Sequence, residues 1–163
     1  MKSFNLISGV KMRIKTLFII FLVSTFSMLA QQKSDNNIAV LDGVSLGMTK
    51  DQVLKQIPAA ASNGMDNNLW LFDSTSLSIG FDENGLVSEV MSDFAFSSVV
   101  VNGFEIKIES DIQAALDFLG KPDKTFKTEM VMEYYFAKTG IVLLTYADDN
   151  AIKLISLQKN YDK

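Results

Sequence analysis

The sequence predicts an α+β fold of two tandem units, each a helix followed by an antiparallel three-strand meander, with the helices on one face of the sheet. Three observations lead to this prediction. Two short apolar stripes at helical spacing each follow a capping signal, three strand-like runs follow each stripe, and turn signals separate the runs. Strands joined by tight turns are antiparallel, which leaves one sheet face for the helices.

The first helix is predicted to begin after Thr49. The Thr49 hydroxyl can cap the free backbone amides while Gln52, three residues on, reaches back, which makes a capping box. The apolar stripe that follows consists of Val53, Leu54 and Ile57. Pro58 is expected to end the helix because a proline cannot continue the hydrogen-bond ladder.

The second helix repeats these signals. Ser110 and Gln113 are predicted to form its capping box, and Gly120 followed by Pro122 is a standard stop signal. A helix is therefore expected between Ser110 and Gly120.

Strand-like runs with period-two alternation or continuous apolar residues follow each helix. They span 69–72, 76–81 and 86–91 in the first unit, and 130–136, 141–146 and 152–158 in the second. Between the units, the runs 97–101 and 104–108 flank Asn102-Gly103, the strongest short hairpin signal. This hairpin is expected to join the units and to extend a shared sheet.

The N-terminus has the three-part pattern of a secretory signal peptide. Basic residues precede an uncharged apolar run, 17–29, which is shorter than a membrane-spanning helix needs and is followed by Ala30. Cleavage near Ala30 is expected, with an uncleaved anchor as the alternative because Met28 is larger than the preferred small residue. The start is either Met1 or Met12. The protein is predicted to be periplasmic or secreted.

The predicted organisation has four parts. Residues 1–30 form the signal peptide, 31–42 a flexible leader, 43–96 the first α+β repeat, and 97–163 the linking hairpin with the second repeat. Residues 31–163 carry 11 basic against 19 acidic side chains, a net charge of −8. Such a chain repels phosphate backbones and anionic headgroups, so neither nucleic acid nor a membrane surface is an expected partner, and no stable anchor is expected after cleavage.

The composition argues against catalysis. The chain has no histidine and no cysteine, so the commonest general base, zinc ligands and thiolate nucleophile are missing, as are disulfides and a lipidated cysteine. The acidic turn at Asp148 and Asp149 lacks the ligand spacing and glycine of a calcium loop. We therefore expect no catalytic residues, no metal and no cofactor.

Aromatic residues suggest a partner-binding surface. Trp70, Tyr134, Tyr135 and Tyr146 are predicted to form a patch on the open face of the sheet, since aromatic side chains flanked by acids are typical of interfaces. The alternative is that the linking hairpin, the other repeat or the leader covers this face. A homodimer would use the same patch.

The segments 46–53 and 119–122, Leu-Gly-Met-Thr-Lys-Asp-Gln-Val and Leu-Gly-Lys-Pro, each lead into a meander. Together they resemble the superfamily of β-lactamase-inhibitor-like and BamE-like proteins in its tandem-repeat form, over about residues 43–158. The resemblance implies an extracytoplasmic module that binds another protein, of an inhibitor or immunity type. The alternative function is a cell-envelope assembly or scaffold component.

Overall fold

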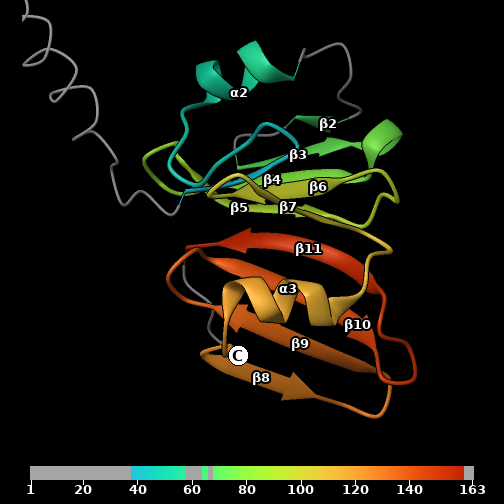
Figure 1. Ribbon diagram of the computed structural model, residues 1–163. Helices are drawn as coiled ribbons and strands as arrows, with labels where there is room; N and C mark the ends of the chain where they lie inside the picture. The colour runs from blue at the N-terminus through green and yellow to red at the C-terminus, as the bar shows by residue number, and fades with distance from the viewer. Residues whose placement is uncertain (1–37, 58–63, 66–67, 160–163) are drawn as a thin grey trace, which may run out of the picture. The chain divides into compact units, whose positions relative to one another are not determined.

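The computed structural model describes residues 38–57, 64–65 and 68–159, and this part of the chain is predominantly β (Figure 1). A three-stranded antiparallel sheet has the order β1-β6-β7, and an eight-stranded antiparallel sheet has the order β2-β3-β4-β5-β11-β10-β9-β8. The strands of the smaller sheet are β1 (Ala39–Leu41), β6 (Ser98–Val101) and β7 (Phe104–Lys107). Those of the larger sheet are β2 (Gly64–Met65), β3 (Leu69–Phe72), β4 (Leu77–Phe81), β5 (Val87–Ser92), β8 (Lys124–Lys127), β9 (Val131–Phe136), β10 (Ile141–Tyr146) and β11 (Ile152–Gln158).

The predicted α+β fold of two helix-plus-three-strand units is wrong. The described residues contain only two short α-helices, α2 (Lys50–Gln56) and α3 (Ile112–Leu119), and a 3-10 turn, η2 (Asp73–Thr75). Strands dominate, and all strands of both meanders belong to one sheet in which β5 pairs with β11. Strands β1, β2 and β8 were not predicted, because the first two are only three and two residues long and every residue of β8 is exposed.

The start of α2 is confirmed. The Thr49 hydroxyl accepts a hydrogen bond from the Gln52 amide at 3.3 Å, and the Gln52 side chain accepts one from the Thr49 amide at 2.8 Å. Asp51 and Lys55 lie at the first and last turns, where their charges complement the helix dipole. Pro58, the predicted stop, lies outside the described residues, and the helix ends at Gln56.

The start of α3 differs from the prediction by one residue. Asp111, not Ser110, caps this helix, and its carboxylate accepts a hydrogen bond from the Gln113 amide at 2.8 Å. The Ser110 hydroxyl instead donates to the Lys107 carbonyl at 2.6 Å, which leaves it pointing back toward β7. Gly120 follows the last helical residue with φ of 84°, a conformation that favours glycine, so the predicted stop is confirmed.

The linking hairpin forms, but it does not extend the larger sheet. Asn102 and Gly103 have φ of 51° and 80°, as a tight hairpin turn requires, and connect β6 to β7. Strand β6 then pairs on its other side with β1, through Leu41 opposite Val99. The segment 31–42, expected as a flexible leader, therefore ends in a paired strand. Its first residues, 31–37, lie outside the described residues.

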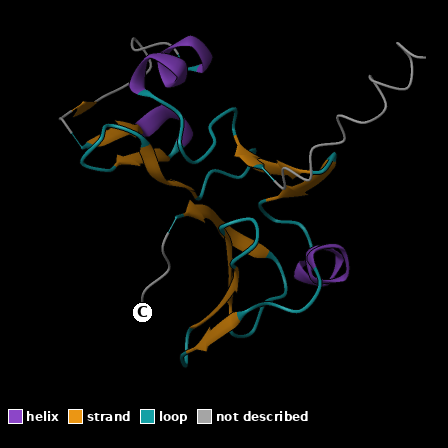
Figure 2. Ribbon diagram, turned by 90° about the vertical axis from the view of Figure 1, so that its left-hand side faces the viewer, coloured by secondary structure: helices purple, strands orange, loops and turns teal. Residues whose placement is uncertain are grey.

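One core joins the two sheets and the helices. Buried residues of β1, α2, β6, β7 and α3 belong to the same cluster as one face of the eight-stranded sheet. Views from two sides show α3 against one side of β9, β10 and β11 (Figures 1 and 2). Phe104 of β7 stacks on Phe118 of α3, with ring centroids 4.1 Å apart. The side chains that the smaller elements add to this core include Leu41, Val53, Val99, Val101, Ile106, Ile112 and Ala115.

The predicted signal peptide, residues 1–30, lies outside the described residues. Among the residues that the structure does describe, no helix is long and apolar enough to cross a membrane.

Candidate functional site

The eight-stranded sheet has two faces of different character. Side chains alternate between the faces along each strand. On the core face lie Trp70, Phe72, Leu77, Ile79, Val90, Ile141, Leu143, Ile155 and Leu157, all buried. These pack against the helices and the smaller sheet, so we call the opposite side the outer face.

A row of side chains crosses the outer face in register. From β3 to β9 it reads Leu71, Ser78, Met91, Ser156, Val142 and Tyr135. Leu71 and Met91 are 41% and 38% exposed, whereas Ser156 and Val142 are buried. The Gln158 side chain donates to the Ser156 hydroxyl at 3.3 Å and to the Glu89 carboxylate at 3.0 Å, and in this way it covers Ser156. Within this row, the exposed apolar side chains are those of β3 and β5; elsewhere on the outer face, Phe126 of β8 and Tyr146 of β10 are also exposed.

A hollow with a volume of about 350 Å³ opens at the end of the outer face toward β3 and β5. Its apolar floor comes from four neighbouring strands and includes Leu71, Met91 and Leu154. Two acidic residues border it, Asp73 in η2 and Asp93 immediately after β5. Among the described residues that line the hollow, these two aspartates are the charged ones.

The turn after β5 is held by buried hydroxyl groups. The Ser92 and Ser97 hydroxyls lie 2.7 Å apart, and both side chains are buried. The Phe94 amide donates to the Ser92 hydroxyl at 3.3 Å, and the Ser97 amide donates to the Phe94 carbonyl at 2.8 Å. Phe96 stands on this turn with 86% of its surface exposed and packs edge-on against Phe94, with centroids 5.4 Å apart. The turn thus presents a large apolar side chain on a hydrogen-bonded base.

The same network reaches η2. The Ser92 hydroxyl also lies within hydrogen-bond distance, 3.3 Å, of the Thr75 carbonyl, to which it can donate. The Thr75 hydroxyl donates to the Phe72 carbonyl at 3.2 Å, and Ser76 adopts a left-handed conformation with φ of 45°. Ser92 therefore connects the two turns that carry Asp73 and Asp93.

A second, polar hollow of about 270 Å³ is lined by Asp82, Ser88, Glu89, Gln158 and Lys159. The Asp82 carboxylate accepts hydrogen bonds from the amides of Asn84 and Leu86. It also forms an ion pair with Lys159, with the charged atoms 3.4 Å apart. The bond from the Leu86 amide is the main reason that the pKa of Asp82 lies below its ordinary value. The side chains of Asp82, Glu89, Gln158 and Lys159 at this hollow therefore already have hydrogen-bond or ion-pair partners.

The four aromatic residues predicted to bind a partner do not form one patch. Trp70 is only 5% exposed, since it lies on the core face against Phe81 with centroids 4.7 Å apart. Tyr134 also lies on the core face, opposite Leu143, and packs against the core. Tyr135 and Tyr146 lie on the outer face. The prediction placed residues of both faces together because aromatic content alone does not reveal which side of a strand each residue occupies.

The residues that surround the hollow were not singled out from the sequence. A signal for Leu71 was present, because Leu69 and Leu71 alternate with Trp70 and Phe72 and so place large apolar groups on both faces of β3. Such a strand needs a partner surface on each side. Nothing local marked Phe96, whose exposure depends on the turn after β5.

Within the described parts of the chain, no group of three or more acidic side chains is placed to hold a metal ion. The aspartates at the hollow belong to separate turns.

Comparison with known proteins leaves the site to be interpreted from its own geometry. No protein-family model matches the chain, and no match is found among curated proteins or among solved structures.

Proposed function

We propose that the chain is an exported, non-enzymatic protein-binding module of the inhibitor or immunity type, and that it binds its partner with the outer face of the eight-stranded sheet. The observation that carries the proposal is the exposed apolar surface around Leu71 and Met91, on the face opposite the core. Contiguous apolar groups on an open sheet face are typical of interaction surfaces.

Charge supports a protein partner over other classes. The net charge of −8 on residues 31–163 disfavours nucleic acid and anionic membranes. The absence of histidine and cysteine from the whole sequence favours binding over the common forms of acid–base and thiol catalysis. Export by a signal peptide cleaved near Ala30 would place this surface in the periplasm or outside the cell.

Site-specific photo-crosslinking in the producing cells tests the proposal. A photoreactive amino acid at Met91 lies on the outer face, and one at Lys55 of α2 is a matched control on an exposed helix. We expect a discrete protein adduct from position 91 and none from position 55. Equal adducts at positions 91 and 55 would contradict the proposal. So would the absence of an adduct both from position 91 and from a second outer-face probe placed at Leu71.

The N-terminal residue of the exported chain is measured in the same preparation. We expect a chain that begins near Gln31. A chain that retains residues 1–30 would contradict the proposed cleavage.

A further inference from the structure

We propose that Asn102 is a site of spontaneous covalent modification, at which the backbone nitrogen of Gly103 displaces ammonia from the Asn102 side chain. The product is a succinimide ring, which water opens to aspartate or to isoaspartate. The site lies at the tip of the β6–β7 hairpin, in the smaller sheet, so this inference does not depend on the proposed partner surface.

The reaction needs only water besides the chain itself. After it loses its proton, the Gly103 nitrogen forms a bond to Asn102 Cγ, and the bond from Cγ to the side-chain nitrogen breaks, so that this nitrogen leaves as ammonia. Water then adds to one of the two ring carbonyl carbons and gives aspartate or isoaspartate, either of which carries a carboxylate in place of the amide. A hydrogen bond to the Asn102 side chain does not prevent the first step, because the atom attacked is Cγ. This reactivity is one reason that asparagine counts as thermolabile.

Ring closure requires one backbone torsion angle that this turn can reach. The ring is nearly planar, so the Cβ of Asn102 and the nitrogen of Gly103 must eclipse one another about the Cα–C bond. An L-amino acid achieves this at ψ of about −120°, which is also the value at the first central position of a type II′ turn. That position needs a positive φ, and Asn102 already has φ of 51°.

The hairpin can pass between two turn types without unpairing its strands. The φ values of Asn102 and Gly103, 51° and 80°, are those of a type I′ turn. Types I′ and II′ both close two-residue hairpins, and they differ by rotation of the central peptide. Because Gly103 has no side chain, it can take the negative φ that a type II′ turn needs at its second central position.

The attacking nitrogen is not engaged by the fold. Among the described residues, the Gly103 amide donates no hydrogen bond, and nothing lies within 4 Å of a Cβ added to Gly103. Asn102 and Gly103 are both exposed, so water reaches the ring that would form. Rotation of the central peptide therefore breaks no hydrogen bond of the Gly103 amide.

A second Asn-Gly pair, Asn84-Gly85, has its nitrogen held by the turn. The Gly85 amide donates to the Asp82 carbonyl at 2.9 Å, and the Asn84 amide donates to the Asp82 carboxylate at 3.0 Å. The Gly85 nitrogen would have to leave Asp82 before it could reach the Asn84 Cγ. Asn84 is therefore an internal control with the same chemistry. The third such pair in the sequence contains Asn63, which lies outside the described residues.

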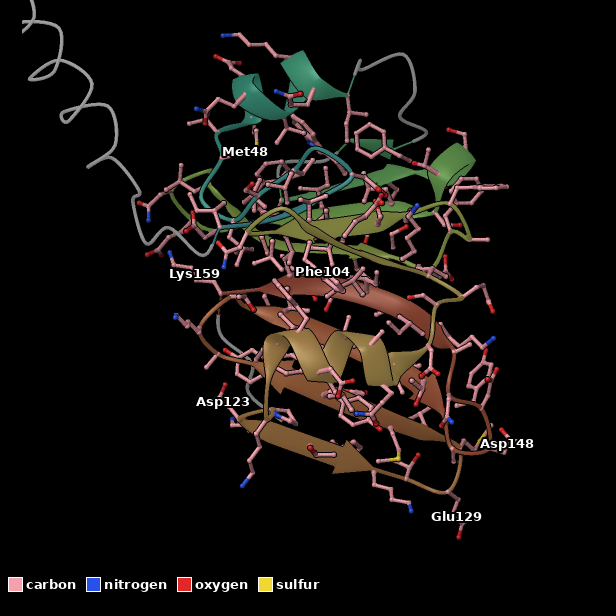
Figure 3. All side chains as sticks on the ribbon, viewed as in Figure 1. Met48, Phe104, Asp123, Glu129, Asp148 and Lys159 are labelled. Atoms are coloured by element: carbon pink, nitrogen blue, oxygen red, sulfur yellow. The ribbon has the colours of Figure 1, made fainter. Side chains whose placement is uncertain are left out.

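The two products should differ in their effect on the hairpin. Val101, before the turn, is buried, and Phe104, after it, stacks on Phe118 of α3 with ring centroids 4.1 Å apart (Figure 3). Aspartate keeps the two-residue loop, and Asp-Gly also favours a type I′ turn. Isoaspartate adds one atom to the main chain, so that Val101 and Phe104 cannot keep their present pairing. We expect the isoaspartate form to have the lower melting temperature.

Peptide mapping of aged protein tests the inference. The purified chain is incubated in a mildly alkaline buffer made with heavy-oxygen water, digested in acid and analysed by mass spectrometry. We expect Asn102 to convert about tenfold faster than Asn84, the factor to which one hydrogen bond of about 1.4 kcal/mol corresponds. Converted Asn102 should contain heavy oxygen and include isoaspartate, which electron-transfer fragmentation distinguishes from aspartate.

The same incubation in urea is the matched control, because both pairs then lose their turns and should convert at equal rates. Gly103→Ala should slow conversion of Asn102, since its methyl group hinders the attacking nitrogen, whereas Gly85→Ala should leave conversion of Asn102 unchanged. Thermal melts establish that each variant is folded.

Three results would overturn the inference. They are conversion of Asn102 no faster than that of Asn84 in the folded protein, a preference for Asn102 that persists undiminished in urea, and unchanged conversion of Asn102 in folded Gly103→Ala. The second result would show that the flanking sequence, and not the turn, selects the site.

Discussion

The hydroxyl groups of Ser92 and Ser97 lie 2.7 Å apart in the interior, five residues apart along the chain. Both side chains are buried, and Ser92 contacts the Thr75 carbonyl as well. A buried hydroxyl is costly unless it is paired, so this contact specifies the path of the turn between the two serines. The turn carries Asp93 and Phe96, which links core packing to the candidate site.

Removal of one hydroxyl should destabilise this turn. Ser97→Ala leaves Ser92 without its closest partner, and we expect the free energy of unfolding to fall by about 1–2 kcal/mol. Ser98→Ala is the matched control, because the Ser98 hydroxyl donates to Glu105 on an exposed surface and should change stability by less than about 0.5 kcal/mol. Urea denaturation measures both. Equal losses would show that the buried pair has no special role.

Gly140 should be intolerant of a side chain for a steric reason. Its φ is 72°, and an added Cβ would lie 2.8 Å from the Gln158 carbonyl oxygen and 3.0 Å from Leu46. Gly85 has nearly the same φ, 71°, but nothing lies within 4 Å of its added Cβ. Gly85→Ala should cost about 1 kcal/mol for the left-handed conformation alone, and Gly140→Ala about 1–3 kcal/mol more. Thermal melts giving the same loss for both would contradict the packing of β10 against β11.

The cap of α3 distinguishes two adjacent residues. Asp111→Ala removes the acceptor for the Gln113 amide and should lower the free energy of unfolding by about 1 kcal/mol. Ser110→Ala removes an exposed hydroxyl that bonds to Lys107, with an expected loss below about 0.5 kcal/mol. Chemical denaturation of the two variants compares them directly. A larger loss for Ser110→Ala would restore Ser110 as the cap.

Acid should destabilise the protein partly through Asp82. Its pKa is lowered chiefly by the hydrogen bond from the Leu86 amide, below the ordinary value of 3.8. The stabilisation is therefore fully present above the pKa of the unfolded chain and is lost as pH falls through the lowered folded value. The melting temperature of the wild type should fall more than that of Asp82→Asn between about pH 6 and about pH 2.5.

Glu83→Gln provides the control for this pH dependence, because Glu83 is the exposed neighbour of Asp82. The melting temperature of Glu83→Gln should fall in acid by as much as that of the wild type. If the melting temperature of Asp82→Asn falls in acid by as much as that of the wild type, the Asp82 carboxylate contributes nothing to the acid destabilisation.

Most predicted features that depend on contacts within a few residues are confirmed. The capping box of Thr49 and Gln52, the stop at Gly120 and the turn at Asn102-Gly103 all form as predicted. Each depends on backbone conformation and hydrogen bonds to near neighbours in sequence. The cap of α3 was misplaced by one residue because Ser110 and Asp111 can each act as a cap, and only the path from β7 chooses between them.

The sequence by itself determined the positions of most strands and turns, since these follow from alternation and turn chemistry. Tertiary structure decided which strands pair and which face each side chain joins. It put β5 beside β11, buried Trp70, packed the partly buried Tyr134 against the core, and brought Asp73 and Asp93 to one hollow. These outcomes depend on pairing between segments far apart in the chain, which no local pattern encodes, because a strand exposes either face until the rest of the core selects one.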